Sequence, residues 1–351
     1  MKRLSSRLAA AGAAALTGAA VALSLGSPAT AAGTGYVALG DSYSSGTGTR
    51  TYISDGTSCQ RSVYAYPSLD AASLSLSLTF RACSGATVAD VTNTQLSALT
   101  STTAYVTISV GGNDAGFASV LTTCAQPSWL SNCYGAIDQA NSVITTTLPG
   151  RLTTLYSSIK AKAPNARVIV VGYPRIFNGE DCNLLTWFSP TEEARLNATA
   201  DLLNSRTQTA AAAAGFQFAN PTSRFVGHAV CDDVEWLNGL SNPVGESYHP
   251  NTSGHRDGYA VVTKPAFGLT TTLSAAATTA KAERSAPRLA KDAQRYAVAD
   301  RTITPERVEA PNLTTAAAKA AAARAGVDLS SRASIDTADR RYEARQLAAR
   351  G

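Results

Sequence analysis

Four short polar blocks of the sequence contain the residue types that nucleophilic catalysis requires. Ser42 follows the apolar run 36–39 through a Gly-Asp turn, and His249 lies in a later block that reads ESYHP. Two further blocks, CSGA and GGND, contribute Gly85 and Asn113. A serine hydroxyl becomes a good nucleophile when a base such as imidazole takes its proton. The oxyanion that then forms on a carbonyl substrate needs N–H donors that are already in place.

These residue types predict one role for each block in an acyl-transfer reaction. Ser42 would be the nucleophile and His249 the general base. The backbone N–H groups of Ser42 and Gly85 and the side-chain amide of Asn113 would bind the oxyanion. Each residue also has a simpler structural explanation, as a helix cap, a turn glycine or a loop histidine. The order in which the blocks follow predicted strands favours the catalytic interpretation.

The elements that must position these blocks alternate between strand and helix patterns. Short apolar runs predict strands at 36–39, 77–81, 104–110, 167–173 and 216–219. Longer amphipathic stretches predict helices at 86–98, 136–162 and 191–214, with Pro149 kinking or splitting the second of these. Such alternation is typical of a parallel sheet that helices cover on both faces. The carboxyl ends of its strands meet at one edge, where ligands bind.

The four blocks also resemble those of a known family. Residues 38–46 (ALGDSYSSG), 82–87 (ACSGAT), 109–114 (SVGGND) and 246–250 (ESYHP) are similar to the sequence blocks of the SGNH, or GDSL-type, hydrolases. The resemblance covers about residues 34–268 and looks closest to secreted actinobacterial GDSL lipases and esterases with three disulfides. It implies a flavodoxin-like three-layer α/β/α sandwich, with no metal and no cofactor. It also implies Ser42 as nucleophile, Ser42, Gly85 and Asn113 in the oxyanion hole, and His249 as base.

One position departs from the family pattern. The family has Asp three residues before the histidine, whereas this sequence has Glu246. Glu246 could be the third member of a triad, or the main-chain carbonyl of Ser247 could orient His249 in a dyad. We favour the carbonyl, because the longer Glu side chain need not reach the same imidazole nitrogen. The other two histidines, His228 and His255, lie outside the blocks, and we expect them to be structural or on the surface.

The first 32 residues have the pattern of a secretory signal peptide. Lys2, Arg3 and Arg7 precede an apolar run at 8–25, and small residues follow, so we expect cleavage near position 31 or 32. A retained membrane anchor is the alternative. Export fits an even number of cysteines. Sequential pairing, one of the many connectivities that six cysteines allow, would give Cys59–Cys83, Cys124–Cys133 and Cys182–Cys231.

The composition changes near Gly268, which we interpret as the end of a hydrolase domain at 33–268. Residues 269–351 are rich in Ala and Arg, contain 14 Lys/Arg and 9 Asp/Glu, and have few large apolar residues. We expect a flexible or weakly helical extension, with a helix at 315–325 that ends at Gly326, or a pro-segment that is removed outside the cell. The basic tail lacks interleaved aromatic residues, so we do not expect nucleic-acid binding.

The residues above predict a secreted carboxylic ester hydrolase, a lipase or broad esterase that acts on fatty-acyl esters and on phospholipid acyl esters. Aromatic and aliphatic residues near the blocks would form the walls of an acyl site: Tyr52, Tyr64, Tyr66, Trp129, Leu184, Leu185, Trp187, Phe188 and Trp236. The alternatives are a carbohydrate acetyl esterase and an exported binding protein without catalysis. We expect a monomer without stable membrane insertion.

Overall fold

A five-stranded parallel sheet forms the centre of the structure, a computed structural model. The strands lie in the order β2-β1-β3-β4-β5, and every pair of neighbours is parallel. Their bounds are β1 (Gly35–Gly40), β2 (Ser77–Phe80), β3 (Tyr105–Ser109), β4 (Arg167–Val171) and β5 (Gln217–Ala219). This is the flavodoxin-like order. The predicted fold class is therefore confirmed, and each predicted strand is present within two residues of its expected bounds.

The structure describes residues 33–305 and 307–350. Residues from Gly33 onward form one compact unit that includes the C-terminal extension. The predicted signal peptide at 1–32 lies outside the described residues. No helix in the described ranges is both long enough and apolar enough to span a bilayer.

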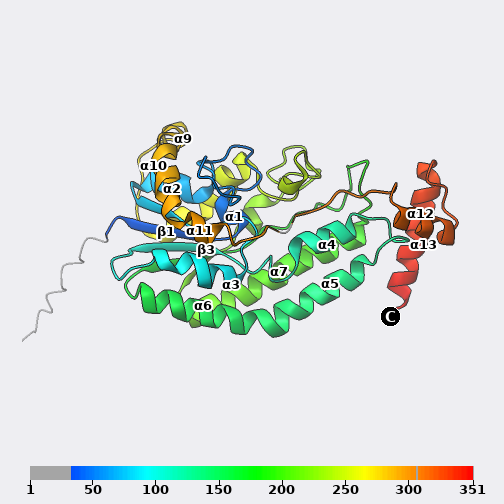
Figure 1. Cartoon of the computed structure of the whole chain (residues 1–351), viewed down its shortest axis with the longest axis horizontal. Helices are drawn as coiled ribbons and strands as arrows, with labels where there is room; N and C mark the ends of the chain where they lie inside the picture. The colour runs from blue at the N-terminus through cyan, green and yellow to red at the C-terminus, as the bar shows by residue number, and fades with distance from the viewer. Residues whose placement is uncertain (1–32, 306, 351) are drawn as a thin grey trace, which may run out of the picture. The chain divides into compact units, whose positions relative to one another are not determined.

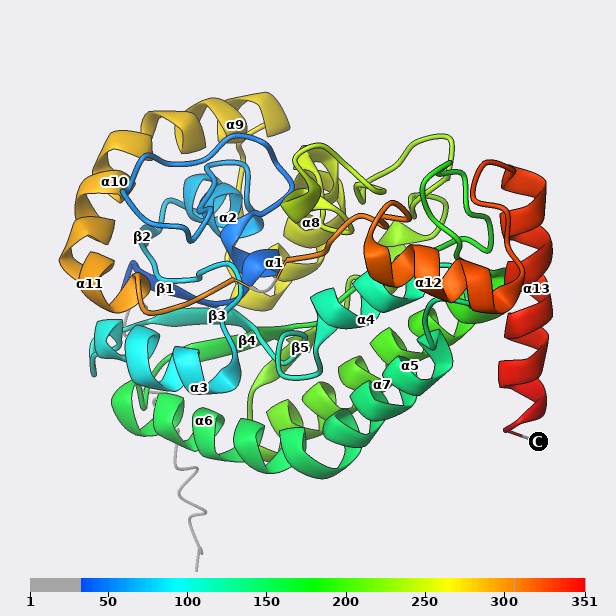
Figure 2. The same cartoon turned by 45° about the vertical axis from the view of Figure 1, so that its right-hand side comes forward.

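Helices cover both faces of the sheet and complete three layers (Figures 1 and 2). One face carries α3 (Val88–Asp90), α5 (Cys133–Ser142), α6 (Leu148–Lys162) and α7 (Pro190–Ala213). The other face carries α2 (Tyr66–Leu74) and α8 (Ala260–Thr263). Two helices begin just beyond the carboxyl ends of strands, namely α1 (Ser42–Ser45) and α4 (Phe117–Cys124). They frame the edge at which the four polar blocks meet.

Pro149 lies where a helix accepts proline. The chain stays helical from α5 through a π-type turn at 143–147 into α6, and Pro149 is in the first turn of α6. A proline has no N–H to donate to the helical ladder, and the π-type turn directly before it interrupts the regular bonding at that point. The predicted division of this long helix therefore falls at the π-type turn that precedes the proline.

Three disulfides tie loops to this frame. They join Cys59 to Cys83, Cys124 to Cys133 and Cys182 to Cys231, which is the sequential pairing. The first of them connects the loop after α1 to the block that holds Gly85. An extended apolar cluster packs around the sheet, with strand residues such as Val106, Ile108 and Val170 fully buried.

The C-terminal extension, which we expected to be flexible or weakly helical, contains several helices and packs on the sheet domain. It forms α9 (Ala275–Arg284), α10 (Ala286–Ala293), α11 (Ala297–Asp300), α12 (Ala316–Ala325) and α13 (Arg332–Ala348). Ala282 and Leu289 are buried in the main core, where α9 packs on α2 and α10 packs on β2. Small apolar residues at helical spacing are enough for this docking, although they could not form a core alone. The expected helix α12 does end at Gly326, which has a left-handed conformation.

Candidate active site

Ser42 is placed by a sharp turn at the end of β1. Gly40 has a φ of +123°, and a Cβ there would lie 2.4 Å from the carbonyl oxygen of Ser109, so only glycine fits. Asp41 then caps helix α1 by accepting a hydrogen bond from the backbone N–H of Tyr43 at 3.0 Å. The Asp41 carboxylate also accepts hydrogen bonds from the hydroxyls of Ser109 and Tyr173. Ser42 is thus the first residue of a helix that is anchored to two neighbouring strands.

His249 lies directly against this serine. Its Nε2 is 2.8 Å from Ser42 Oγ, and its Nδ1 is 2.9 Å from the main-chain oxygen of Ser247. A carbonyl oxygen can only accept, so the proton of the neutral ring is on Nδ1, and Nε2 is free to accept from the serine hydroxyl. Tyr248 has a φ of +61°, and its carbonyl accepts a hydrogen bond from Tyr43 at 2.7 Å. These contacts fix the loop that presents the imidazole.

Glu246 points away from the histidine. Its Oε1 accepts a hydrogen bond from the Tyr52 hydroxyl at 2.6 Å, and its Oε2 lies 3.6 Å from Arg50 Nε. The side chain is almost fully buried in this position. The group in contact with His249 Nδ1 is therefore the Ser247 carbonyl, which is the arrangement of a dyad. Glu246 has a different partner, the hydroxyl of Tyr52.

The three predicted oxyanion donors line one cleft with the pair. Ser42, Gly85, Asn113 and His249 all border the same small cavity. Asn113 Nδ2 donates to the carbonyl of Ala86 at 3.0 Å, which orients its amide and leaves a second N–H. The N–H of Ser42, as the first of helix α1, has no acceptor within the helix. The sequence blocks therefore do converge, as the strand order requires.

Burial sets the ionisation of the two key titratable groups. It lowers the pKa of His249 to about 4, although the hydrogen bond to Ser247 opposes this shift. Burial also raises the pKa of Asp41 to about 6, against the hydrogen bonds from Tyr173, Ser109 and the backbone N–H of Tyr43. At neutral pH the imidazole is uncharged and can take a proton from Ser42, which is what a general base requires.

The two remaining histidines have structural contacts. Buried His255 accepts a hydrogen bond from the backbone N–H of Tyr66 at 3.3 Å through its Nδ1. His228 stacks on Trp236 with ring centroids 3.7 Å apart. Neither imidazole contacts Ser42, as expected from their positions outside the blocks. The described residues contain one group of three possible metal ligands, Cys182, Cys231 and Glu235, but the two cysteines form a disulfide and offer no thiolate.

An apolar cavity of about 70 Å³ lies beside the nucleophile helix. Its lining comes from α1, α4, α5, α7 and nearby turns, including Tyr43, Phe117, Leu121, Ile144 and Leu203. Phe117 borders both this cavity and the cleft at Ser42. The apolar residues of α4 and α7 recur at helical spacing, but that pattern in the sequence could not distinguish a pocket wall from ordinary core.

The side chains that we expected to form the walls of an acyl site lie outside this cavity. None of the nine side chains named for that role lines the apolar cavity. Trp129 and Trp187 are buried in a separate cluster beneath α12 and α13, and Tyr66 is part of the core. Leu184 and Leu185 are exposed. Several of the aromatic residues near the blocks in sequence are thus packed against the extension or in the core.

A serine–histidine pair at the carboxyl edge of a parallel sheet fits a serine hydrolase, and comparisons with known proteins show a serine ester hydrolase. Residues 38–256 match the GDSL-like lipase/acylhydrolase family, and the chain belongs to this family. It is 48% identical over 262 residues to Lipase 1 of Streptomyces coelicolor, covering 74% of this chain and 95% of that protein. It is 44% identical over 231 residues to the lipase of Streptomyces rimosus, covering 65% of this chain and 85% of that protein.

Two solved structures show the same fold. The extracellular lipase of Streptomyces rimosus superposes with a TM-score of 0.62 at 42% identity, covering 66% of this chain and 98% of that chain. Phospholipase A1 of Streptomyces albidoflavus superposes with a TM-score of 0.63 at 42% identity, covering 67% of this chain and 99% of that chain. Nearly the whole of each relative is matched by about two thirds of this chain, so the remainder of the chain has no counterpart in them.

Proposed function

We propose that this chain is an exported enzyme that hydrolyses carboxylic esters of apolar acyl chains through an acyl-enzyme on Ser42. One observation carries the proposal. His249 Nε2 lies 2.8 Å from Ser42 Oγ while its Nδ1 is occupied by the Ser247 carbonyl, so a neutral base faces the hydroxyl in the required tautomer. Family membership alone would not assign these roles to these atoms.

In acylation, Ser42 Oγ would attack the ester carbonyl carbon as its proton moves to His249 Nε2. The carbonyl oxygen becomes an oxyanion, and the N–H groups of Ser42 and Gly85 and the Asn113 amide would donate to it. The tetrahedral intermediate then collapses, the C–O bond to the alcohol breaks, and His249 returns the proton to the departing alkoxide. The alcohol leaves, and the acyl group remains esterified to Ser42.

Deacylation would repeat these steps with water. His249 takes a proton from a water molecule as its oxygen attacks the acyl carbon, and the same donors hold the second oxyanion. Collapse of this intermediate breaks the bond to Ser42 Oγ, which regains the proton from His249. The products are a free carboxylic acid, an alcohol and the original enzyme. The main-chain carbonyl of Ser247 keeps the imidazole oriented throughout.

The apolar cavity supports an acyl chain as the recognised part of the substrate. Its lining is almost wholly apolar, and Phe117 connects it with the cleft at Ser42. An acetyl group would leave this cavity unused, which favours longer acyl esters over acetylated sugars. Phospholipid acyl esters are included because a relative of similar fold is a phospholipase A1. Export is supported by the three disulfides, which persist in oxidising compartments.

The test is hydrolysis of p-nitrophenyl esters from acetate to palmitate, together with phosphatidylcholine, by the wild-type chain and Ser42→Ala. We expect hydrolysis to favour esters longer than acetate and to fall by on the order of 10³-fold or more in Ser42→Ala. Undiminished hydrolysis by Ser42→Ala would refute the mechanism. Preference for acetate and for acetylated xylan would instead identify a carbohydrate esterase.

A further inference from the structure

Part of the C-terminal extension lies over the catalytic cleft. Between α11 and α12 the chain passes the start of α1 as an extended segment, visible in both cartoon views (Figures 1 and 2). We call residues 303–305 and 307–308 of this segment the strap. Pro305, Arg307 and Val308 of the strap border the same cavity as Ser42 and His249. Residues far apart in the sequence therefore share one site.

The strap is packed tightly against the oxyanion hole. A Cβ built on Gly85 would lie 2.4 Å from the Cα of Pro305, so the two backbones are in direct contact. Ile303 and Val308 on either side of Pro305 are only 2% and 5% exposed. The cavity that remains at Ser42 measures about 10 Å³, which is roughly the space of one water molecule. An ester with its acyl chain and alcohol cannot enter while the strap is in place.

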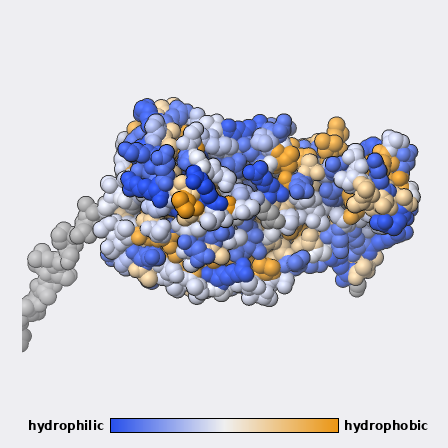
Figure 3. Space-filling model, viewed as in Figure 1, coloured by the Kyte–Doolittle hydropathy of each residue, from blue (hydrophilic) through white to orange (hydrophobic). Residues whose placement is uncertain are grey.

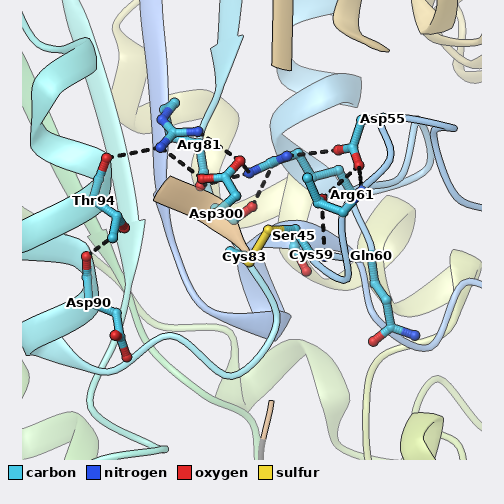
Figure 4. Close-up of a disulfide and its surroundings, with 12 residues drawn as sticks. Ser45, Asp55, Cys59, Gln60, Arg61, Arg81, Cys83, Asp90, Thr94 and Asp300 are labelled. Atoms are coloured by element: carbon cyan, nitrogen blue, oxygen red, sulfur yellow. Dashed lines mark hydrogen bonds and ion pairs between the residues drawn. A yellow bond between two sulfur atoms is a disulfide. The ribbon is translucent and has the colours of Figure 1, made fainter. Parts of the chain in front are cut away.

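A buried ion cluster anchors the upstream end of the strap (Figure 4). Asp300, the last residue of α11, lies 2.6 Å from Arg61 and 3.0 Å from Arg81, and all three side chains are at most 1% exposed. Arg61 also contacts Asp55 at 2.7 Å. Without Asp300, Arg61 would keep only the Asp55 carboxylate and Arg81 would lose its carboxylate partner, which is unfavourable for buried guanidinium groups. The extension therefore supplies a carboxylate that pairs with two buried arginines of the hydrolase domain.

The downstream end is anchored by hydrogen bonds and apolar packing. The backbone N–H of Glu309 donates to Thr122 Oγ1 at 2.9 Å. Beyond it, α12 and α13 cover Trp129 and Trp187, and Trp187 Nε1 donates to Asp336 at 3.1 Å. The face in Figure 3 shows apolar residues scattered among hydrophilic ones and no broad apolar surface. The strap borders the catalytic cleft, and α12 and α13 cover the loops that hold Trp129 and Trp187.

We infer that the C-terminal extension is an intramolecular inhibitor, whose strap occupies the ester-binding cleft so that hydrolysis requires its release. This inference rests on the proposed function, because it places the strap where the ester would bind. Two independent anchors flank the strap, and a chain segment without a role at the cleft would need neither.

The test weakens the strap within the full chain. Ile303→Ser combined with Val308→Ser removes its two buried side chains, and Asp300→Ala removes the upstream anchor. Val298→Ser is the matched control, because Val298 lies on α11 in the same extension and is 81% exposed. For each variant the measurements are kcat/KM on p-nitrophenyl butyrate and the rate at which a fluorophosphonate labels Ser42. Far-UV circular dichroism and thermal unfolding identify the variants that remain folded.

We expect the folded strap variants to exceed the wild type at least tenfold in both rates, with the control within twofold of the wild type. Equal, measurable rates in the wild type and in either folded strap variant would overturn the inference and leave the proposed function intact. If neither the wild type nor any variant labels at Ser42 or hydrolyses esters, the proposed function fails and the inference fails with it.

Discussion

Replacing Glu246 by Gln tests which group orients the catalytic histidine. In a serine protease, converting the triad acid to its amide lowers turnover by about 10⁴, chiefly because the histidine takes the wrong tautomer. In this chain His249 Nδ1 is 2.9 Å from the Ser247 carbonyl, which no side-chain change removes, and Glu246 instead binds Tyr52. We therefore expect Glu246→Gln to lower kcat/KM by less than about tenfold, because the Ser247 carbonyl would still fix the tautomer of His249.

The stability effect should be small as well. A hydrogen bond to a charged group contributes about 1 kcal/mol more than a neutral one, and the amide introduced by Glu246→Gln would keep only the neutral form. That difference corresponds to a melting temperature lower by about 2 °C in a chain of this size. The Arg50 side chain is 58% exposed, so its ion pair with Glu246 adds little.

The assay is hydrolysis of p-nitrophenyl butyrate with thermal unfolding measured on the same samples. Tyr52→Phe is the control, because it removes the hydroxyl that donates to Glu246 and leaves the His249 contacts in place. It should lower stability and leave kcat/KM nearly unchanged. A loss above a thousandfold in Glu246→Gln, with unfolding unchanged, would show a Ser-His-Glu triad and refute the dyad.

Three further predictions concern the oxyanion donor Asn113, the general base His249 and the Cys59–Cys83 disulfide. Asn113→Ala should lower kcat by roughly 10²–10³ with little change in KM, measured on the same ester. Because protonated His249 cannot act as base, and its pKa is about 4, kcat/KM should be lost as pH falls through about 4 rather than 6.5. Opening the strap would expose the imidazole, so in the Ile303→Ser/Val308→Ser variant kcat/KM should be lost at a higher pH than in the wild type. Loss at the same pH in both would count against this prediction. Replacing Cys59 and Cys83 by Ser opens a loop with a sequence separation of 24 residues, and should lower the free energy of unfolding in urea by about 3 kcal/mol.

Much of the sheet and of the polar edge was predictable from the sequence. Buried parallel strands read as short apolar runs, and the first three are each followed closely by a polar block, which placed Ser42, Gly85 and Asn113 at one edge. His249 lies well beyond the last strand, so its place at that edge was expected from its block and from the family resemblance. The tight turn at Gly40 was also predictable, because the backbone passes so close to Ser109 that only glycine fits there. The strand order then brought the blocks to one edge, as in other sheets of this type.

The acyl cavity and the docked extension were not predictable in this way. The cavity is formed by helices that pack side by side, and Leu121 or Leu203 looks like an ordinary core residue in the sequence. Asp300 looks like one more solvated charge in a charged tail, because its partners Arg61 and Arg81 are more than two hundred residues away. Long-range pairing of this kind leaves no periodic signal, and the low apolar content therefore led us to expect a flexible or weakly helical extension rather than one packed on the core.

The most direct measurement of the proposed mechanism is covalent labelling of the full chain with a fluorophosphonate, followed by peptide mass mapping. We predict that the label is found on Ser42, that labelling is strongly slowed in His249→Ala, and that Glu246→Gln labels at nearly the wild-type rate. A label on another residue, or wild-type labelling of Ser42 in His249→Ala, would contradict the mechanism.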